Sequence, residues 1–390
     1  LELSAKSVNN SGRFGADIRT ESTNRCAKRL RARLSCVSVN PCIRSYSETT
    51  RRVERIMSKR HQRVTIEDVA REAGVSMMTV SRVINGTGRI SEETREYVRE
   101  VAARLGYRPN RAARTLVTNR TMMVGLIVPD ITNPYFSEIF QGAEEVFWQE
   151  GYNVLVANTN EIPARERAVL MQLDETTIDG LIICSSRLSD KVLFPLLKRH
   201  PVVVALNRRP PQPLASVVAA RYRQGALPLM AARYLSETGR RRIGFFSLKH
   251  SSQYLSIRDF VRELTAEGIE VKREWCVSGY PTWKSGYELG QQLLHAHPEL
   301  DAVIGGNDLV ALGIMQAAKD LGRTIPDDLA ITGVDDILLV SQVTPPLTTF
   351  RVPKREMGAE AARLLLLRMQ GDMTYREFNY DAELVIRGSA

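Results

Sequence analysis

Five side chains within one short segment could hydrogen-bond to a nucleic acid: Ser76, Thr79, Ser81, Arg82 and Asn85. Hydroxyl and amide groups donate to phosphate oxygens, which fixes the register of a protein on a duplex without reading its sequence. A guanidinium can form two hydrogen bonds to the edge of a guanine, a contact worth about 1–3 kcal/mol of discrimination between bases. This spacing therefore predicts a segment that both holds DNA and reads it.

Such side chains need a helix that presents them together, and the surrounding sequence predicts one. Two short helical patterns flank the small-residue turn Ala73-Gly74-Val75, and Ser76 is a good N-cap for the second helix. Met77 and Met78 follow on its exposed face. The pattern is typical of a helix-turn-helix, whose second helix enters the major groove. An ordinary helical hairpin packed in a core is the alternative.

A third helix is predicted from about Ser91, a further N-cap, to Leu105, with Gly106 as its C-cap. Its apolar residues recur at helical spacing and form one face: Val98, Val101, Ala102 and Leu105. Residues 61–108 should therefore form a compact helical DNA-binding domain. The pattern of residues 110–116 predicts a short helical stretch with a thin apolar face, so residues 109–120 are predicted to be a hinge helix and linker.

Charge is distributed in agreement with a DNA-binding N-terminal region. The net charge of +10 divides into +9 for residues 1–60, +4 for 61–120 and −3 for 121–390. Residues 1–60 lack periodicity and are rich in Ser, Asn, Thr and Arg, so we expect a disordered basic extension. Alternatively this segment is an over-extended start, with the native beginning near Met57.

Several classes of protein are disfavoured by composition. No apolar run approaches the length of a membrane span, and the first residues lack the apolar stretch of a secretory signal, so we expect a cytoplasmic protein without membrane association. The five cysteines are scattered, and neither they nor the histidines show metal-ligand spacing. We therefore expect no metal or cofactor, and Cys184 and Cys276 should be buried.

Beyond residue 121, apolar strand-like runs alternate with amphipathic helices. Two such series predict two α/β lobes, each with a parallel sheet covered on both faces. Ligands of such folds bind at the carboxyl ends of the strands, here facing a cleft between the lobes. The C-terminal segments, a helix at 353–369 and a strand at 382–387, should complete the second lobe. The predicted strands are 124–128, 152–157, 180–184 and 202–206, then 243–248, 275–278, 302–305 and 329–333.

With these features together, the chain from about Val64 to its C-terminus resembles the LacI/GalR family of bacterial transcription regulators. The resemblance implies a helix-turn-helix head on a two-lobed, periplasmic-binding-protein-like core that senses a small molecule. It also implies a homodimer, in some members a tetramer, that binds a palindromic operator. Besides the head motif, it depends on these segments: 107–110, 128–136, 179–182, 239–243, Asn307-Asp308 and Gly333-Val334-Asp335-Asp336.

The resemblance assigns roles to the head and hinge. The two positions after Ser76 read bases in the family; here both are methionine, so contact with thymine methyl groups is expected, or one methionine fills the core. Leu116 would be a minor-groove wedge, Ala113 would permit close approach and Arg111 would hold a phosphate. Packing of Leu116 on the core is the alternative. The full predicted DNA-binding set is Thr65, Ser76, Met77, Met78, Thr79, Ser81, Arg82, Asn85, Tyr107, Asn110, Arg111, Ala113 and Leu116.

The resemblance also places an effector site. Asp335 would accept hydrogen bonds from the ligand, Asn307 would add a polar contact, and Tyr135 and Phe136 would stack on a ring. Arg258 lies two places after the position at which the family has an effector-binding arginine, which is Ser256 here. A helix cap for Asp335 or Asn307, and core packing for the two aromatic residues, are the alternatives.

Other departures from the family pattern bear on the kind of effector. Ala220-Arg221 stands where the family usually has aspartate and asparagine, and four arginines cluster near the expected cleft. A sugar, a sugar acid or a sugar phosphate therefore remains open, as does loss of sensing. These four arginines are Arg208, Arg209, Arg221 and Arg223.

The sequence thus favours a ligand-responsive repressor of a carbohydrate or sugar-acid catabolic or transport operon. A solute-binding component of a sugar transport system could use the same core, but it would not need the DNA-reading head. An enzyme is disfavoured because the sequence has no phosphate loop, nucleophile elbow or metal cluster.

Overall fold

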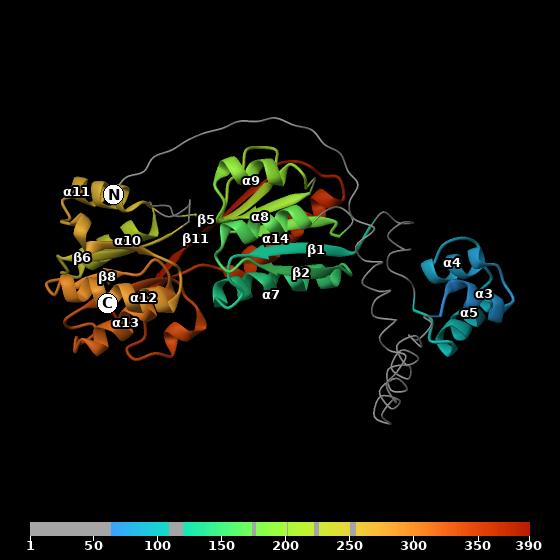
Figure 1. Ribbon diagram of the computed structural model, residues 1–390, viewed down its shortest axis with the longest axis horizontal. Coiled ribbons are helices and arrows are strands. Elements are labelled where there is room, and N and C mark those ends of the chain that lie inside the picture. The colour runs from blue at the N-terminus through green and yellow to red at the C-terminus, as the bar shows by residue number, and fades with distance from the viewer. Residues whose placement is uncertain (1–63, 109–119, 174–176, 201, 222–225, 250–254) are drawn as a thin grey trace, which may run out of the picture. The chain divides into compact units, whose positions relative to one another are not determined.

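The computed structural model describes residues 64–108, 120–173, 177–200, 202–221, 226–249 and 255–390. The chain divides into two compact units, 1–109 and 110–390 (Figure 1). The extension predicted for residues 1–60, including Met57, lies outside the described residues. So does the hinge predicted for residues 109–120, except for Arg120.

The N-terminal unit, the head, contains three helices in its described part: α3 (Ile66–Ala73), α4 (Met77–Asn85) and α5 (Glu92–Arg104). Gly74, with φ 65°, ends α3, as the predicted turn requires of a residue without a side chain. Gly106 takes a left-handed φ of 67° directly after Leu105, which is the C-cap of α5. The three helices share one apolar core, which includes the face predicted for α5. Its buried residues are Val69, Ala70 and Ala73 of α3, Val80 and Val83 of α4, and Val98, Val101 and Ala102 of α5.

The first lobe is built on a parallel sheet with strand order β11-β5-β4-β3-β1-β2. Helices α7 and α14 cover one face of this sheet, and α8 and α9 cover the other (Figure 1). The strands are β1 (Met123–Val128), β2 (Asn153–Asn158), β3 (Gly180–Cys184), β4 (Val203–Leu206), β5 (Ser216–Arg221) and β11 (Glu377–Asp381). The helices are α7 (Pro134–Gln149), α8 (Pro163–Gln172), α9 (Asp190–Leu197) and α14 (Lys354–Met369).

The second lobe repeats this plan with strand order β12-β10-β9-β8-β6-β7, in which only the β10–β12 pairing is antiparallel. Helices α10 and α11 cover one face, and α12 and α13 cover the other. The strands are β6 (Ile243–Leu248), β7 (Cys276–Gly279), β8 (Ala302–Ile304), β9 (Ala330–Asp335), β10 (Thr348–Arg351) and β12 (Glu383–Val385). The helices are α10 (Leu227–Glu237), α11 (Ile257–Ala266), η1 (Arg273–Trp275), α12 (Trp283–Ala296), α13 (Asp308–Asp320) and η2 (Leu338–Ser341).

Two lobes of alternating strands and helices were predicted, and this expectation is confirmed. The assignment of the whole C-terminal region to the second lobe is wrong. Helix α14 packs against α7 of the first lobe, where the backbones approach so closely that a Cβ on Gly142 would lie 1.9 Å from the carbonyl oxygen of Arg355. Strand β11 joins the first sheet beside β5, and only β12 completes the second. Hydrophobic periodicity identified the helix, but not the lobe on which its apolar face packs.

Within the described part of the chain, no helix is long and apolar enough to cross a membrane. The same residues contain no group of three or more His, Cys, Asp or Glu side chains that could hold a metal ion. Cys184 and Cys276 are buried free thiols, as expected, and burial raises the pKa of Cys276 to about 12. Neither thiol is therefore activated as a nucleophile.

Candidate functional site

The first candidate surface is the outer face of α4 in the head. Ser76 caps this helix: its Oγ accepts a hydrogen bond from the Thr79 amide at 3.1 Å and lies 2.9 Å from the Thr79 hydroxyl oxygen. Met77 and Met78 are 53% and 63% exposed, so neither fills the core of the head. The predicted N-cap and the predicted exposed methionine pair are therefore both present.

Buried valines on the opposite side of α4 set which residues face outward. Val80 and Val83 are 0% and 1% exposed in the head core, which leaves Arg82 exposed and Ser81 half-buried. Asn85 is exposed, and its Nδ2 donates to Ser81 Oγ at 3.3 Å. The helix therefore presents methionine, hydroxyl, amide and guanidinium groups on one surface, a set that can contact phosphates, thymine methyls and guanine.

Thr65 and Tyr107 lie at the two ends of the described head. Thr65 forms a capping box at the start of α3, in which its amide donates to Asp68 Oδ2 at 2.9 Å and its Oγ accepts from the Asp68 amide at 3.3 Å. The bonds that the Thr65 amide and hydroxyl donate to the Asp68 carboxylate lower the pKa of Asp68. Tyr107 is half-buried against the head core. The remaining predicted DNA-binding residues, Asn110, Arg111, Ala113 and Leu116, lie outside the described residues.

A second candidate site lies where the strands of the core end. Six non-glycine residues, each at the end of a strand or within three residues after it, have left-handed φ values between 43° and 116°. Such backbone is unfavourable for residues with a side chain and persists where the surroundings enforce it, often at functional sites. In the first lobe these residues are Asn160, Glu161, Ser185 and Asn207, and in the second Asp335 and Asp336.

In the first lobe, three polar side chains meet at the strand ends. Asn207 Nδ2 donates to the Tyr135 hydroxyl at 2.6 Å and lies 3.3 Å from Ser185 Oγ. Tyr135 and Phe136 are 7% and 4% exposed and pack edge to face with their ring centroids 5.1 Å apart. Both rings are thus part of the core, the alternative to ring stacking, and the Tyr135 hydroxyl reaches the polar group. Ser185 and Asn207 were not predicted, although each directly follows a fully buried strand.

A buried ionic network fixes the loops around this group. Arg187 Nη2 donates to Glu161 Oε1 at 2.8 Å, and the Arg187 amide donates to Glu166 Oε2 at 2.8 Å. The Ser186 hydroxyl also donates to Glu166, and burial raises the pKa of that carboxyl. These bonds connect the segment after β3 to Glu161, one of the left-handed residues after β2, and to Glu166 of α8.

Arg208 and Arg209 are engaged within the first lobe. Arg208 is 3% exposed, and its Nη2 donates to Asp190 Oδ1 at 2.6 Å and to the Leu188 carbonyl at 2.9 Å. Arg209 donates from Nε to Glu377 at 3.0 Å, which links it to the edge strand β11. Both arginines therefore already have acidic partners, which weakens the argument that they bind an anionic effector. The side chain of Arg221 and all of Arg223 lie outside the described residues.

In the second lobe, Asp335 lies at the end of β9 beside a second buried acid. Asp335 and Asp308 are 6% and 1% exposed. Asp308 accepts hydrogen bonds from the Thr349 hydroxyl at 2.5 Å and from the Ile337 amide at 2.8 Å. Burial is the largest cause that raises the pKa of Asp308, to about 7, and burial together with Asp308 raises that of Asp335. None of the described residues donates a hydrogen bond to the Asp335 carboxylate, so it can accept one from a ligand.

Lys354 connects this acidic site to the first lobe. It lies at the start of α14, is 4% exposed, and its Nζ donates to the carbonyl oxygens of Asp335 at 2.6 Å and Asp336 at 3.1 Å. The same Nζ lies 3.5 Å from Glu138 Oε2 on α7. Lys354 thus ties the end of β9 to two helices that cover the first sheet.

Asn307 and Arg258 differ in how well they fit an effector site. Asn307 is the N-cap of α13: its Oδ1 accepts from the Val310 amide at 3.0 Å, and its Nδ2 donates to the Pro281 carbonyl at 3.3 Å. This is the capping alternative, and it leaves Asn307 buried. Arg258 has an 87% exposed side chain at the start of α11, and no bond between described residues connects it to Asp335. Their roles as effector ligands stay predictions.

Two exposed side chains at the ends of β6 and β7 were not predicted. Lys249 Nζ lies 5.5 Å from the centroid of the Tyr280 ring, and Tyr280 is 46% exposed. An accessible aromatic ring can stack on a sugar, and an ammonium group can bind an anionic substituent. Their positions in the sequence could have identified them, since each residue directly follows a strand.

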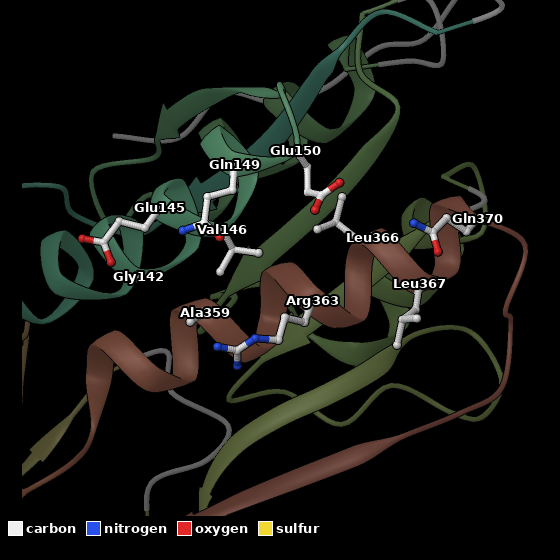
Figure 2. Close-up of a pocket in the computed structure, with 10 residues that line it drawn as sticks. All are labelled: Gly142, Glu145, Val146, Gln149, Glu150, Ala359, Arg363, Leu366, Leu367 and Gln370. Atoms are coloured by element: carbon white, nitrogen blue, oxygen red, sulfur yellow. The ribbon is translucent and has the colours of Figure 1, made fainter.

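A surface groove of about 550 Å³ lies elsewhere on the first lobe, between α7 and α14. Figure 2 shows Val146 and Gln149 of α7 on one side and Arg363 and Leu366 of α14 on the other. The lining residues of α7 begin at Gly142, whereas Tyr135 and Phe136 lie in its first turn. The groove therefore does not belong to the strand-end site.

Comparison with known proteins matches both units of the chain. The family model described as bacterial regulatory proteins, lacI family, matches residues 65–110, and a periplasmic binding protein-like domain matches residues 232–390. Catabolite control protein A of Priestia megaterium is 36% identical over 309 residues, which cover 77% of this chain and 91% of that protein.

Solved structures extend the match to the three-dimensional fold. A Lac repressor dimer bound to operator and the anti-inducer ONPF has a TM-score of 0.73 at 26% identity, over 84% of this chain and 99% of that one. The transcriptional regulator CelR in complex with cellobiose has a TM-score of 0.61 at 30% identity, over 84% of this chain and 100% of that one. The fold predicted from sequence, a helix-turn-helix head with a two-lobed α/β core, is therefore confirmed.

Proposed function

Because this chain belongs to the lacI family of bacterial regulatory proteins, we propose that it represses a carbohydrate or sugar-acid catabolic or transport operon under the control of a small-molecule effector. The single observation that carries the proposal is a helix-turn-helix head with an exposed recognition surface on α4, joined to a two-lobed core. The core residues at the strand ends supply the sensor. We propose no catalytic activity, and we propose that the protein acts in the cytoplasm, where it would meet its operator.

In this proposal, α4 lies in the major groove of an operator half-site. Ser76, Thr79, Ser81 and Asn85 hold phosphates, with Thr65 and Tyr107 at the ends of the head. Met77 and Met78 contact thymine methyl groups, because their thioethers can donate no hydrogen bond to a base. Arg82 then provides the main hydrogen-bonded readout, through the edge of a guanine.

The hinge completes DNA recognition. Residues 109–120 would form a helix that pairs with its copy across the dimer and enters the minor groove. Leu116 would be inserted between base steps, while Asn110, Arg111 and Ala113 would contact or approach the backbone. A helix this short is marginal alone, so lobe movements driven by effector could melt it and release DNA.

The effector is proposed to bind at the strand ends of both lobes. Asp335 accepts hydroxyl hydrogens of the ligand, and the Tyr135–Ser185–Asn207 group offers further polar contacts. A neutral sugar fits these groups best, because Arg208 and Arg209 already have acidic partners within the first lobe. A sugar acid or sugar phosphate would need Lys249 or Arg258 instead.

A homodimer is proposed to form through apolar residues left exposed by the second lobe. Trp283 is 44% exposed and stacks on Tyr287 at a centroid distance of 5.3 Å, while Leu338 and Leu339 are 76% and 50% exposed. Helices α12 and α13 pack together, and the Ile337 amide just before η2 donates to α13, so all four side chains lie on neighbouring elements. An apolar surface of this kind is typical of an interface.

Leu338→Glu should convert the dimer to a monomer and weaken operator binding by about 100-fold, because a palindromic site then loses the second head's effective concentration. Sedimentation equilibrium and titration of a duplex selected by the wild-type protein from a random pool measure the two effects. Met373→Glu, which places the same charge on a 45% exposed methionine of the first lobe, is the matched control. A Leu338→Glu protein that remains dimeric would exclude this interface.

Asp335→Asn should abolish thermal stabilisation by the effector. A ligand at 100 times its Kd adds about 2.7 kcal/mol to the native state, which raises the Tm by several degrees. The probes are individual sugars, sugar acids and sugar phosphates, and Asp327→Asn on the exposed surface of the same lobe is the control. If Asp335→Asn retains the full shift, Asp335 does not bind the effector.

A solute-binding component of a transport system is the second candidate, favoured only by the likeness of the core to periplasmic binding proteins. It predicts tight sugar binding without selection of any duplex. Selection of a palindromic duplex whose affinity changes with sugar would contradict it.

A further inference from the structure

The turn after α4 returns to the helix and packs against the side chain of Arg82. The Gly86 amide donates to the Arg82 carbonyl as the cap of the helix, and the Thr87 amide donates to the same carbonyl at 2.9 Å. Because the Arg82 carbonyl accepts both bonds, the chain turns back and Gly88 lies alongside Arg82. A Cβ built on Gly88 would lie 3.0 Å from Arg82 Cδ and 3.5 Å from both Cγ and Nε.

This arrangement confines the aliphatic stem of Arg82 but leaves its guanidinium available. Arg82 is exposed, and no described residue forms a hydrogen bond or ion pair with its guanidinium. Two hydrogen bonds to one guanine require the planar group at a defined angle, and a long side chain loses rotational freedom when it is held there. A stem that already packs against backbone loses less on binding.

We infer that Gly88 is a positioning residue for base readout: its bare backbone forms the seat on which the Arg82 stem lies, so that the guanidinium is presented to the major groove. This inference rests on the proposed function. A side chain at position 88 would crowd the Arg82 stem, because a contact of 3.0 Å to Cδ is tighter than most Cβ contacts and the stem would have to move to relieve it. Arg82 would then be displaced while the helix itself remained intact.

Gly88 has φ +79°, so glycine is also favoured there by conformation alone. Gly86 separates the two explanations. Its φ of +68° imposes nearly the same conformational cost on alanine, but a Cβ at Gly86 would have no neighbour within 4 Å. Gly86→Ala is therefore a matched control for backbone strain in the same turn.

The experiment uses the full-length protein and the tightest duplex that the wild type selects from a random pool, together with all single base-pair substitutions of that duplex. Gly88→Ala should weaken binding by about fivefold to tenfold and reduce discrimination at the same base pairs as Arg82→Ala. In an Arg82→Ala background, Gly88→Ala should cause no further loss. Gly86→Ala should keep the base preferences of the wild type.

The inference would be overturned if Gly88→Ala weakened duplex binding by the same factor in the Arg82→Ala background as in the wild type. Equal base preferences in the Gly86→Ala and Gly88→Ala proteins would also overturn it. Gly88→Asn repeats the test with a residue that tolerates left-handed backbone, and a melting curve of each variant reports folding. If Arg82→Ala itself leaves every base preference unchanged, the role of Arg82 in the proposed function fails. If Arg82→Ala changes the base preferences but Gly88→Ala does not, the positioning role of Gly88 is disproved and the role of Arg82 stands.

Discussion

Replacing Val98 with aspartate will abolish sequence-specific DNA binding and leave the two-lobed core folded. Val98 is 0% exposed and packs with Val69 and Val80 at the centre of the head. An unpaired carboxylate at this position costs several kcal/mol. A helical domain this small has a total stability of only a few kcal/mol, so the head will unfold.

The position makes the result informative, because α5 carries none of the side chains proposed to touch bases. Tyr97→Asp adds the same charge to the neighbouring residue, which is 49% exposed, and should bind DNA nearly as the wild type does. Duplex titration and circular dichroism melting measure binding and the two unfolding transitions separately. Operator affinity within tenfold of the wild type in the Val98→Asp protein would show that the head is not the DNA-binding unit.

The core will be more stable at pH 5 than at pH 7.5, and Asp308→Asn will remove the part of this difference that Asp308 contributes. Burial raises the pKa of Asp308 from the ordinary 3.8 to about 7, with Asp336 adding to the rise and Lys354 opposing it. Asp335, beside it, shifts in the same direction. The folded protein therefore holds protons at pH 5 that the unfolded chain releases.

The sign follows from this proton balance. Where the native state binds more protons, stability falls as pH rises, so the contribution of Asp308 is complete below about pH 4 and is lost by about pH 7. A shift of this size corresponds to about 4 kcal/mol. Asn at position 308 can keep both contacts, because its oxygen accepts from the Ile337 amide and the Thr349 hydroxyl can turn to accept from its nitrogen.

Urea denaturation of the core at pH 5 and pH 7.5 measures the effect. Glu288→Gln, on the exposed surface of α12, is the control and should leave the pH dependence unchanged. An equal change in unfolding free energy between pH 5 and pH 7.5 for the wild type and Asp308→Asn would show that Asp308 does not hold a proton in the folded core.

The sequence predicted the elements well where local signals were strong. Ser76 and Ser91 stand as caps where predicted, because an N-cap depends only on neighbouring backbone amides. Strands 180–184 and 243–248 have the predicted bounds, because each is an apolar run over its whole length. Strands β5, β10 and β11 and helix α10 were missed. Strand β11 is an exposed edge strand with no apolar run.

The candidate effector site was less predictable, since it depends on contacts between distant segments. Tyr135 was identified, but Ser185 and Asn207 join it only through the pairing of β1 with β3 and β3 with β4. The acidic partners of Arg208 and Arg209 are likewise set by tertiary packing. A periodic pattern shows which face of an element is apolar, but not which charged side chain meets it.

The return of α14 and β11 to the first lobe has a consequence for the order in which the chain folds on the ribosome. The head can close soon after its residues emerge, but the first lobe lacks a helix and an edge strand until residues 354–381 have been made, and the second lobe lacks only the edge strand β12 at that point. Until then the apolar face of α7 is not covered by Met357, Ala361 and Leu365 of α14. The first lobe to begin is thus completed only after nearly all of the second lobe has been made, and a nascent chain stalled before residue 354 presents that face to chaperones.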